Sequence, residues 1–369
     1  MMKESEPRRF PPQTVIDKPE VGVASESSSR LRREIVTSTG RLLKVTTVFD
    51  TYWRFAAARQ EIFMRRLEGI RPPWSDDPIL STYRFTNPYR ASDRVSQYMI
   101  RHVLYDGDRS IEEVFFRALL FRLFNKVETW ERLDSVLGPL TWGDFDYGSY
   151  VEVLDAATGS GQRIYSGAYI IPSPRFGSQR KHHNQLKLLE RMMNEGVPHR
   201  VRAAGSFLEV FDIIRSYPSF GNFLSFQFSI DLNYSEILEF SENEFVVAGP
   251  GAQAGIRKCF SDMGGASYEE VIQTVAEVAK GEFERLDLTF KTLWGRELHL
   301  VDYQNLFCEV DKYARVAFPT LTAESPRRRI KRKYSPNPAP LPQWYPPKWK
   351  LRVPRALLKP QVNGTRWNA

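Results

Sequence analysis

Apolar residues recur at helical spacing along most of this 369-residue chain, and this pattern limits its possible folds more than any other feature. It begins in VFDTYWRFAAARQEIFMRRLEG, where Tyr52, Phe55 and Ile62 form an apolar stripe. It resumes at GSQRKHHNQLKLLERMMNEG and continues to about residue 318, and RIYSGAYIIPSP is the one β-like interruption. The chain is therefore predicted to be all-α, as one domain or as two closely packed lobes.

Composition changes toward both ends. Residues 1–47 mix Pro, Ser, Glu and Arg without periodicity, so we expect a flexible N-terminal segment there and a helical domain over residues 48–318. Residues 319–369 form a Pro-rich basic tail that cannot build a helical core, because ESPRRRIKRKYSPNPAPLPQWYPPKWKLRVPRALLKP holds nine of the 24 prolines. Its RRRIKRK cluster suits a nuclear-import signal or a phosphate-binding arm. Trp344, Tyr345 and Trp349 either stack on bases or pack back onto the domain.

The formal charge of +8 belongs to the tail. After Glu324 there are twelve Lys or Arg and no acid, so the other residues carry 40 basic against 44 acidic side chains, a net of −4. Since no run of about 18 uncharged apolar residues exists and MMKESEPRRFPP has no apolar core, we expect a soluble, intracellular protein without a membrane partner. Cys259 and Cys308 are too few for a disulfide scaffold and are not spaced for zinc.

The stretch YPSFGNFLSFQFSIDL, residues 217–232, ends one apolar helix at a Pro and starts another after a Gly. The helix-hairpin-helix of DNA-repair proteins has this order of residue types. Gly221 is expected to turn with positive φ, and the free amides of Ser219, Phe220, Gly221 and Asn222 are expected to hold a DNA phosphate. The alternative is an ordinary corner between two helices, since Ser219 replaces the usual first Gly.

A second Gly-rich turn lies in EFVVAGPGAQAGIRKCF. Gly249 and Gly251 flank Pro250 before a helix that carries Arg257 and Lys258. Backbone amides at that helix start, together with the two cations, predict a site for phosphate or pyrophosphate. It is not a Walker A loop, because no Gly-Lys-Ser/Thr follows at the required spacing.

Three carboxylates are candidate catalytic residues. In glycosylases built on this hairpin, a carboxylate about 20 residues beyond the hairpin Gly faces the extruded nucleotide. Glu242 and Glu244 occupy that neighbourhood, while Asp302 qualifies only if an insertion intervenes. Each of them fits a surface or capping role as well.

The remaining polar patterns suggest DNA contact and no metal. Arg59 and Arg66 lie beside the apolar stripe of the first helix, as a DNA-binding or simply solvated face. His182 and His183 are adjacent in a basic helix, which suits solvent or phosphate better than a metal, and no other histidine has a partner at ligand spacing. No metal and no cofactor are predicted.

Several segments together resemble the DNA base hypermodification family. They are TYWRFAAARQEIFMRRLEG, PPWSDDPIL, YRFTNPYRASDRVSQYMI, FRLFNKVETW, YPSFGNFLSFQFSIDLNYS, EFVVAGPGAQAGIRKCF and VDYQNLFCEVDKYAR. That family includes the helical domain beside 5-hydroxymethyluracil DNA kinases and is allied to the alpha-glutamyl/putrescinyl thymine pyrophosphorylases. The similarity spans roughly residues 48–318 and implies a DNA-glycosylase-like helical fold that acts on modified thymine in DNA.

The leading hypothesis is a DNA-associated protein, nuclear if eukaryotic and otherwise in the cytoplasm or nucleoid. It would bind double-stranded DNA, extrude a 5-substituted pyrimidine and take part in its hypermodification as a transferase or pyrophosphorylase. One alternative is a non-catalytic module that recruits a separate kinase or transferase. Another is a DNA glycosylase. The sequence has no kinase domain to support phosphorylation by this chain.

Overall fold

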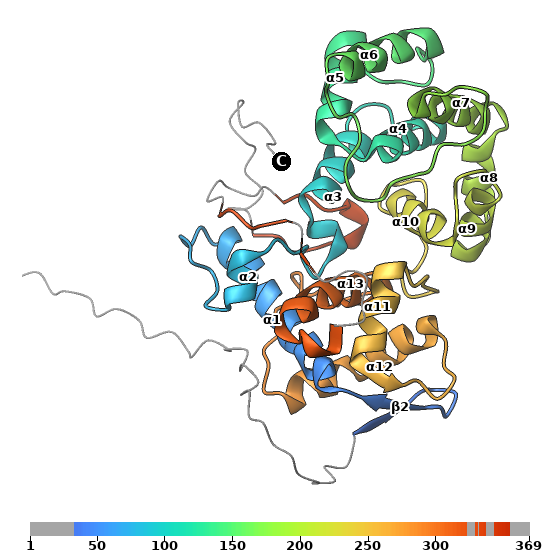
Figure 1. The fold of residues 1–369 in the computed structure, drawn as a ribbon. Coiled ribbons are helices and arrows are strands. Elements are labelled where there is room, and N and C mark those ends of the chain that lie inside the picture. Colours follow the sequence, from blue (N-terminus) through green and yellow to red (C-terminus); the bar gives the residue numbers. More distant parts are fainter. Residues whose placement is uncertain (1–32, 323–328, 331, 337–342, 355–369) are drawn as a thin grey trace, which may run out of the picture.

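The computed structural model describes residues 33–322, 329–330, 332–336 and 343–354 (Figure 1). The α-helices are α1 (Thr47–Leu67), α2 (Pro78–Thr82), α3 (Arg94–Tyr98), α4 (Ile111–Phe124), α5 (Val127–Leu137), α6 (Tyr147–Gly159), α7 (Lys181–Asn194), α8 (Val197–Ala203), α9 (Phe207–Arg215), α10 (Asn222–Asn233), α11 (Pro250–Cys259), α12 (Tyr268–Arg285) and α13 (Leu300–Ala317). Short 3₁₀ turns at Arg90–Ser92, Thr320–Thr322 and Pro347–Trp349, and a π-helix at Met99–Tyr105, complete the helical elements. The prediction of a mostly helical chain is confirmed.

The helices gather into two lobes (Figure 1). The α4 lobe holds α3 to α10, packed around the apolar helix α4, whose residues from Val114 to Phe124 are all buried. The α13 lobe holds α1, α2, α11, α12 and the strands, packed around α13. The sequence did not decide between one domain and two closely packed lobes, and the structure shows two lobes.

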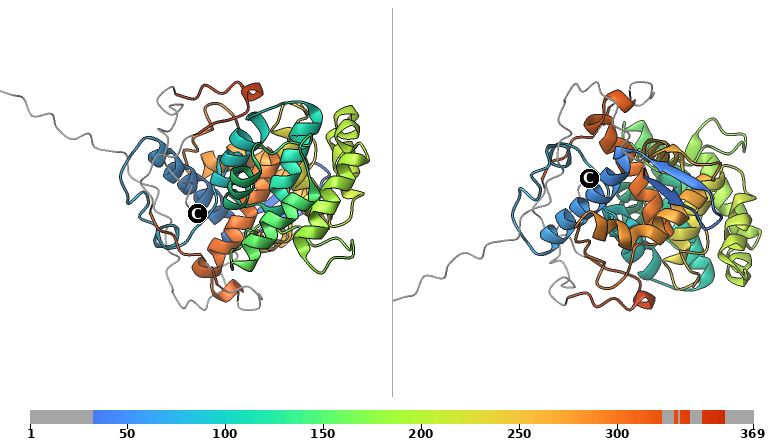
Figure 2. Two further views of the ribbon diagram at one scale, coloured as in Figure 1. Left: turned by 90° about the horizontal axis from the view of Figure 1, so that it is seen from above. Right: turned by 90° about the horizontal axis from the view of Figure 1, so that it is seen from below.

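A small antiparallel sheet completes the α13 lobe and lies on its side away from the α4 lobe (Figure 2). Its strands are β1 (Glu34–Val36), β2 (Leu42–Val45) and β3 (Phe260–Asp262), in the order β1-β2-β3. Ile35 pairs with Leu43 in the β1–β2 register, and both side chains are buried. This hairpin differs from the irregular structure expected up to residue 47, because strands of three and four residues are too short to show a period. Residues 1–32 lie outside the described part of the chain.

The predicted β-like segment at residues 163–174 contains no strand. Side chains from neighbouring helices bind its carbonyl oxygens instead of a strand partner. Thr129 Oγ1 donates to Ile164 O at 2.8 Å, and Gln185 Nε2 donates to Ile171 O at 3.0 Å. The apolar run therefore forms a loop held against α5 and α7, and this loop carries Tyr169 toward the junction of the lobes.

Close packing of α11 on α13 explains the glycines of the second Gly-rich turn. A side-chain carbon at Gly255 would overlap the carbonyl oxygen of Phe307, and one at Gly251 would overlap the sulfur of Cys308. Neither glycine has a positive φ. These residues are needed for close approach of the two helices rather than for turn conformation.

Residues 343–354 pack back onto the domain. Tyr345 is buried, with its hydroxyl 2.8 Å from Ser92 Oγ, and Arg296 lies over the ring of Trp349 at 3.6 Å. Of the two alternatives for these aromatic residues, the structure therefore shows packing onto the domain. Arg327, Arg328 and Lys331 of the RRRIKRK cluster lie outside the described residues.

Candidate functional site

Helix α13 holds the segment that joins α2 to α3. Asp302, Asn305 and Glu309 lie on one face of α13 because they are three and seven residues apart. Asp302 Oδ1 accepts a hydrogen bond from Arg90 N at 2.8 Å, and Glu309 Oε2 accepts one from Thr86 N at 3.1 Å. Asn305 Nδ2 donates to the Asn87 carbonyl at 3.0 Å. These bonds fix the backbone from which Arg90 extends toward the α4 lobe.

Arg90 enters a buried ionic network in the α4 lobe. Its Nη2 lies 2.7 Å from Asp231 Oδ1, and its Nε donates to Gln227 Oε1 at 2.8 Å. Arg122 from α4 approaches the other oxygen of Asp231 at 2.5 Å. All three charged side chains are at most 4% exposed, so one carboxylate compensates two buried guanidinium ions. These three residues together carry a net positive charge, and the buried carboxyl of Asp93 is close enough to Arg90 to interact with its charge.

The rings of Tyr169 and Tyr234 lie over this network, Tyr234 at 5.5 Å from the guanidinium of Arg90. Tyr169 lies over the guanidinium of Arg90 at 5.7 Å and over that of Arg122 at 5.1 Å, and it stacks on Phe223. Tyr169 has a φ of 52°, which is uncommon for a bulky residue. Within the described part of the chain, Arg90 Nη1 and Arg122 Nε are buried and have no hydrogen-bond partner. Unused buried donors are costly, so this is the most unusual polar environment of the junction.

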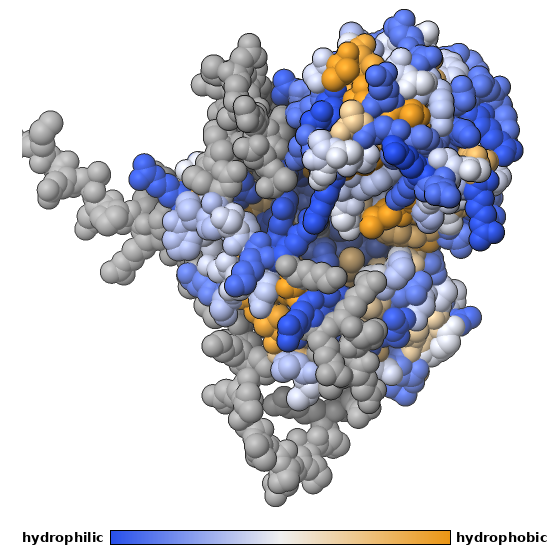
Figure 3. All heavy atoms as spheres, turned by 45° about the horizontal axis from the view of Figure 1, so that its top comes forward, coloured by the Kyte–Doolittle hydropathy of each residue, from blue (hydrophilic) through white to orange (hydrophobic). Residues whose placement is uncertain are grey.

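The first turns of α10 and α11 meet next to these rings. The ring of Phe223, in the first turn of α10, lies against Gly249, the N-cap of α11, so closely that a side-chain carbon at Gly249 would overlap it. In the space-filling view the two lobes enclose a hollow between them (Figure 3). The junction therefore combines cations, aromatic rings and two helix N-termini.

The segment predicted to be a helix-hairpin-helix forms a turn between α9 and α10, and its backbone differs from the expectation. Ser219, not Gly221, takes the positive φ, at 72°. Gly221 is extended, with φ −79° and ψ 171°, and serves as the N-cap of α10, which removes the conformational reason given for that glycine. Phe220 is buried in the core, while Gly221 and Asn222 are exposed.

The predicted phosphate cradle is not assembled as expected. Gly249 and Gly251 lie at the start of α11, whereas Arg257 and Lys258 lie in its last turn. Arg257 donates to Tyr268 Oη at 2.6 Å, and Lys258 forms a buried ion pair with Asp311. Because the helix separates the cations from the turn, the four residues do not form one site.

The three predicted carboxylates have two different environments. Glu244 accepts hydrogen bonds from Phe207 N at 2.9 Å and Leu208 N at 3.3 Å, so it caps α9. Glu242 lies instead at the start of α13, where Arg296 Nη2 approaches its Oε1 at 2.7 Å and His299 Nδ1 its Oε2 at 3.6 Å. The structure therefore places Glu242 beside Asp302 and separates Glu244 from both.

The paired carboxylates have opposite pKa shifts. Burial acts to raise the pKa of Glu242, but Arg296 and His299 hold it below its ordinary value. Burial, together with the charge of Glu242, raises the pKa of Asp302 to about 6. The two neighbouring carboxyl groups therefore titrate differently, a difference found both at acid–base sites and in buried structural carboxylates.

Arg59 and Arg66 line a small pocket on the α13 lobe, with a volume of about 70 Å³. Trp74, Tyr83 and Tyr334 are among the other lining residues. Arg66 lies over the Trp74 ring at 5.2 Å, and burial lowers the pKa of Arg59 to about 10. Arg59 Nη1 has no hydrogen-bond partner within the described residues. A cavity of about 280 Å³ beside α5 includes none of the predicted site residues.

Sequence reasoning missed Arg90, Arg122, Asp231 and Tyr169. One indication was present, because Arg122 and Asp231 each interrupt the apolar sequence of a helix, IEEVFFRALLFRLF and NFLSFQFSIDLN. A charged residue in a helix that is apolar all round is buried with a partner. The partner itself could not be identified, because Arg90 and Asp231 are 141 residues apart.

A family model and a curated protein both relate this chain to 5-hmdU DNA kinases. Residues 46–323 match the family described as 5-hmdU DNA kinase, helical domain. The chain is 30% identical over 308 residues to the 5-hmdU DNA kinase of Bacillus phage SP10, which covers 78% of this chain and 47% of that protein. The chain thus spans about half the length of this curated relative. No solved structure matches the chain, and no helix in the described residues is long and apolar enough to cross a membrane.

Proposed function

This chain belongs to the family of 5-hmdU DNA kinase helical domains, and on that premise we propose that it acts in the hypermodification of thymine-derived bases in DNA. In this proposal it binds duplex DNA and holds an extruded 5-hydroxymethyluracil at the junction of the two lobes. The modifying reaction on the hydroxymethyl group is completed here or by a separate kinase or transferase.

The observation that carries the proposal is the environment of Tyr169. A flipped base is bound by stacking on aromatic rings and by hydrogen bonds to its edge. Tyr169 and Phe223 offer two stacked rings, and Arg90 Nη1 and Arg122 Nε are buried donors without partners beside them. Uracil carbonyl oxygens are hydrogen-bond acceptors, so these donors match the edge of the proposed base.

The proposed contacts to the DNA backbone come from elsewhere. Arg59 and Arg66 present cations beside the ring of Trp74, and Arg59 has an unused donor. Phosphate contacts of this kind position a duplex without reading its sequence. The free amides at the start of α10 supply a further phosphate site in this proposal.

A fluorescence assay tests base binding. Duplexes with one 5-hydroxymethyluracil, or thymine at the same position, are labelled with 2-aminopurine beside that base. The protein is expected to bind the modified duplex more tightly and to raise its fluorescence by unstacking the label. Tyr169→Leu should remove both effects. Tyr165→Leu is the matched control, because Tyr165 lies in the same loop and also stacks on a Phe, at 5.4 Å. Equal affinity of the parent protein for both duplexes, without a fluorescence change, would exclude the proposal.

Nucleoside mass spectrometry separates the three reaction classes. DNA containing 5-hydroxymethyluracil is incubated with the protein and candidate donors and then digested. A new nucleoside mass means group transfer, free base means a glycosylase, and neither means a binding module. If the chain is catalytic, Glu242→Gln and Asp302→Asn should abolish the product while Glu244→Gln, a change in a helix cap, retains it.

A further inference from the structure

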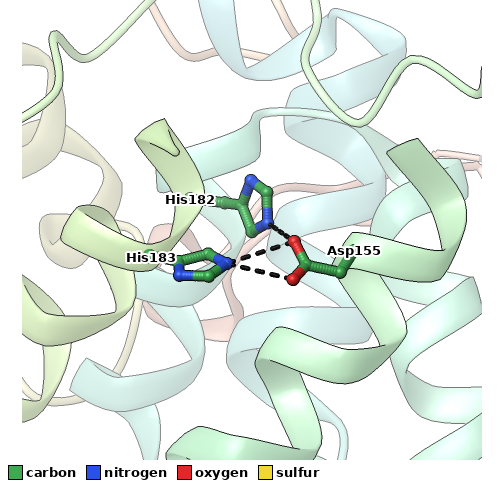
Figure 4. Close-up of side chains that lie close together, drawn as sticks. All are labelled: Asp155, His182 and His183. Carbon is green, nitrogen blue, oxygen red and sulfur yellow. Dashed lines mark hydrogen bonds and ion pairs between the residues drawn. The ribbon is translucent and has the colours of Figure 1, made fainter. Parts of the chain in front are cut away.

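Three side chains converge between α6 and α7, within the α4 lobe. Asp155 comes from α6, and His182 and His183 come from the first turn of α7. Figure 4 shows both imidazole rings directed at the Asp155 carboxylate. His182 Nε2 lies 2.6 Å from Oδ1, and His183 Nε2 lies 3.1 Å from Oδ1 and 3.2 Å from Oδ2.

Two adjacent histidines at the start of a helix have no general reason to point at the same carboxylate. Consecutive residues of an α-helix point about 100° apart, so their rings must turn toward each other to meet at one oxygen. The ring centroids lie 4.7 Å apart, and His182 is only 5% exposed.

The three side chains are close enough together to surround a small divalent ion after a short outward movement, since His182 Nε2 and His183 Nε2 now lie at hydrogen-bond distance from Asp155 Oδ1. The possible ligand atoms of the three residues all lie within 4.8 Å of one another. Ligands about 2.0–2.2 Å from a tetrahedral zinc ion are separated from each other by roughly 3.3–3.6 Å. Each of the two nitrogens would therefore move about 0.2–1 Å away from Asp155 Oδ1 to reach that separation.

We propose that Asp155, His182 and His183 bind a divalent transition-metal ion of the zinc type, linking α6 to α7. Two imidazoles and one carboxylate are donors that suit such ions. Three protein ligands leave a coordination position for water. Arg180 also contacts Asp155, but its side chain is 56% exposed, so it can leave the carboxylate when a cation arrives. Sequence reasoning predicted no metal here, because His182 and His183 are adjacent in a basic helix, and it did not connect them with Asp155, which is 27 residues from His182.

Metal titration of the full chain tests the site. After removal of metals with a chelator, zinc is titrated by calorimetry and cobalt(II) is followed by its visible absorption. We expect one equivalent of each ion at this site and a higher melting temperature with zinc. His183→Gln should weaken zinc binding at least about tenfold. Loss of an outer-shell partner typically weakens metal binding by about 10- to 100-fold, and loss of a direct ligand should weaken it at least as much. His199→Gln is the matched control, since it removes an exposed histidine paired with Glu112 alone.

A second variant distinguishes a metal site from a simple ionic cluster. Arg180→Gln removes the cation that competes for Asp155, so it should tighten zinc binding. If the cluster serves only as a structural ion pair, Arg180→Gln lowers stability and leaves metal binding at background. Absence of binding by both the parent and Arg180→Gln would overturn the proposal. So would binding that is unchanged in His183→Gln, because the ion would then lie elsewhere.

Discussion

At the scale of single residues, the neighbours of a carboxylate decide its role. Glu242 and Glu244 are two positions apart, yet Glu242 faces Arg296 and His299 at the start of α13 while Glu244 caps α9. Asp302 is buried beside Glu242 and accepts hydrogen bonds from Arg90 N and His299 N. The backbone bonds fix its position, and burial together with the charge of Glu242 raises its pKa. Protonation of Asp302 therefore makes the stability of the junction depend on pH.

The raised pKa of Asp302 gives a pH-dependent stability. Its folded pKa of about 6 lies above its ordinary value of 3.8, so the folded state binds this proton more tightly than the unfolded state. Its contribution to the free energy of unfolding is full below about pH 4 and is lost as pH rises through about 6, by up to about 3 kcal/mol. Asp302→Asn does not titrate. Its melting temperature relative to the parent should therefore rise between pH 4 and pH 7 in thermal denaturation.

Glu242→Gln provides the control for this titration. Removal of the neighbouring negative charge should lower the pKa of Asp302 and move the pH-dependent change to lower pH. A difference between Asp302→Asn and the parent that stays constant across the range would show that Asp302 does not titrate there.

At the scale of elements, local patterns predicted where helices begin, and tertiary contacts decided what lies beside them. The starts of α10 after Gly221 and of α11 after Gly249 follow from Gly and Pro at those positions. The sequence pattern could not give the positive φ of Ser219, the contact of Gly249 with Phe223, or the ions around Asp231. Each depends on residues far apart in the chain. The β1–β2 hairpin was missed for a different reason, since its strands are shorter than the window a period requires.

The α9–α10 turn can be tested for DNA binding without loss of the fold. Gly221 is an extended N-cap, and a side-chain carbon there meets nothing within 4 Å. Because Ser is a better N-cap than Gly, Gly221→Ser should leave the melting temperature unchanged or slightly higher. Its hydroxyl would accept the α10 amides that the hairpin hypothesis assigns to a phosphate. DNA affinity, measured by fluorescence anisotropy, should then fall several-fold.

Asn222→Ala is the companion variant for this turn, because the hypothesis uses main-chain amides and not the exposed Asn222 side chain. It should bind DNA as the parent does. If Gly221→Ser also binds normally, the turn is a bend between two core helices, and the pocket of Arg59 and Arg66 becomes the better candidate for the DNA surface.

At the scale of the whole molecule, the segment at residues 343–354 joins the two lobes from outside the family match. Lys348 Nζ donates to the carbonyl oxygens of Asn233, Ser235 and Leu238 after the end of α10, at distances of 2.5–2.9 Å. Trp349 packs on Arg296, which pairs with Glu242. The chain after Glu324 therefore combines two roles, a packed segment that holds the lobes together and the net positive charge of the protein. A deletion of the tail would remove both at once.

Charge neutralisation isolates the electrostatic role of the tail. Replacing the six basic residues of RRRIKRK, residues 327–333, with Gln removes half of the twelve positive charges after Glu324 and keeps residues 343–354. If these charges contact DNA phosphates, nonspecific affinity should fall, and the slope of log affinity against log salt should flatten by up to about five. The melting temperature should stay near that of the parent, since the packed segment is intact. An unchanged salt slope would place the phosphate contacts on the folded lobes, where the arginines of α1 are the first to substitute.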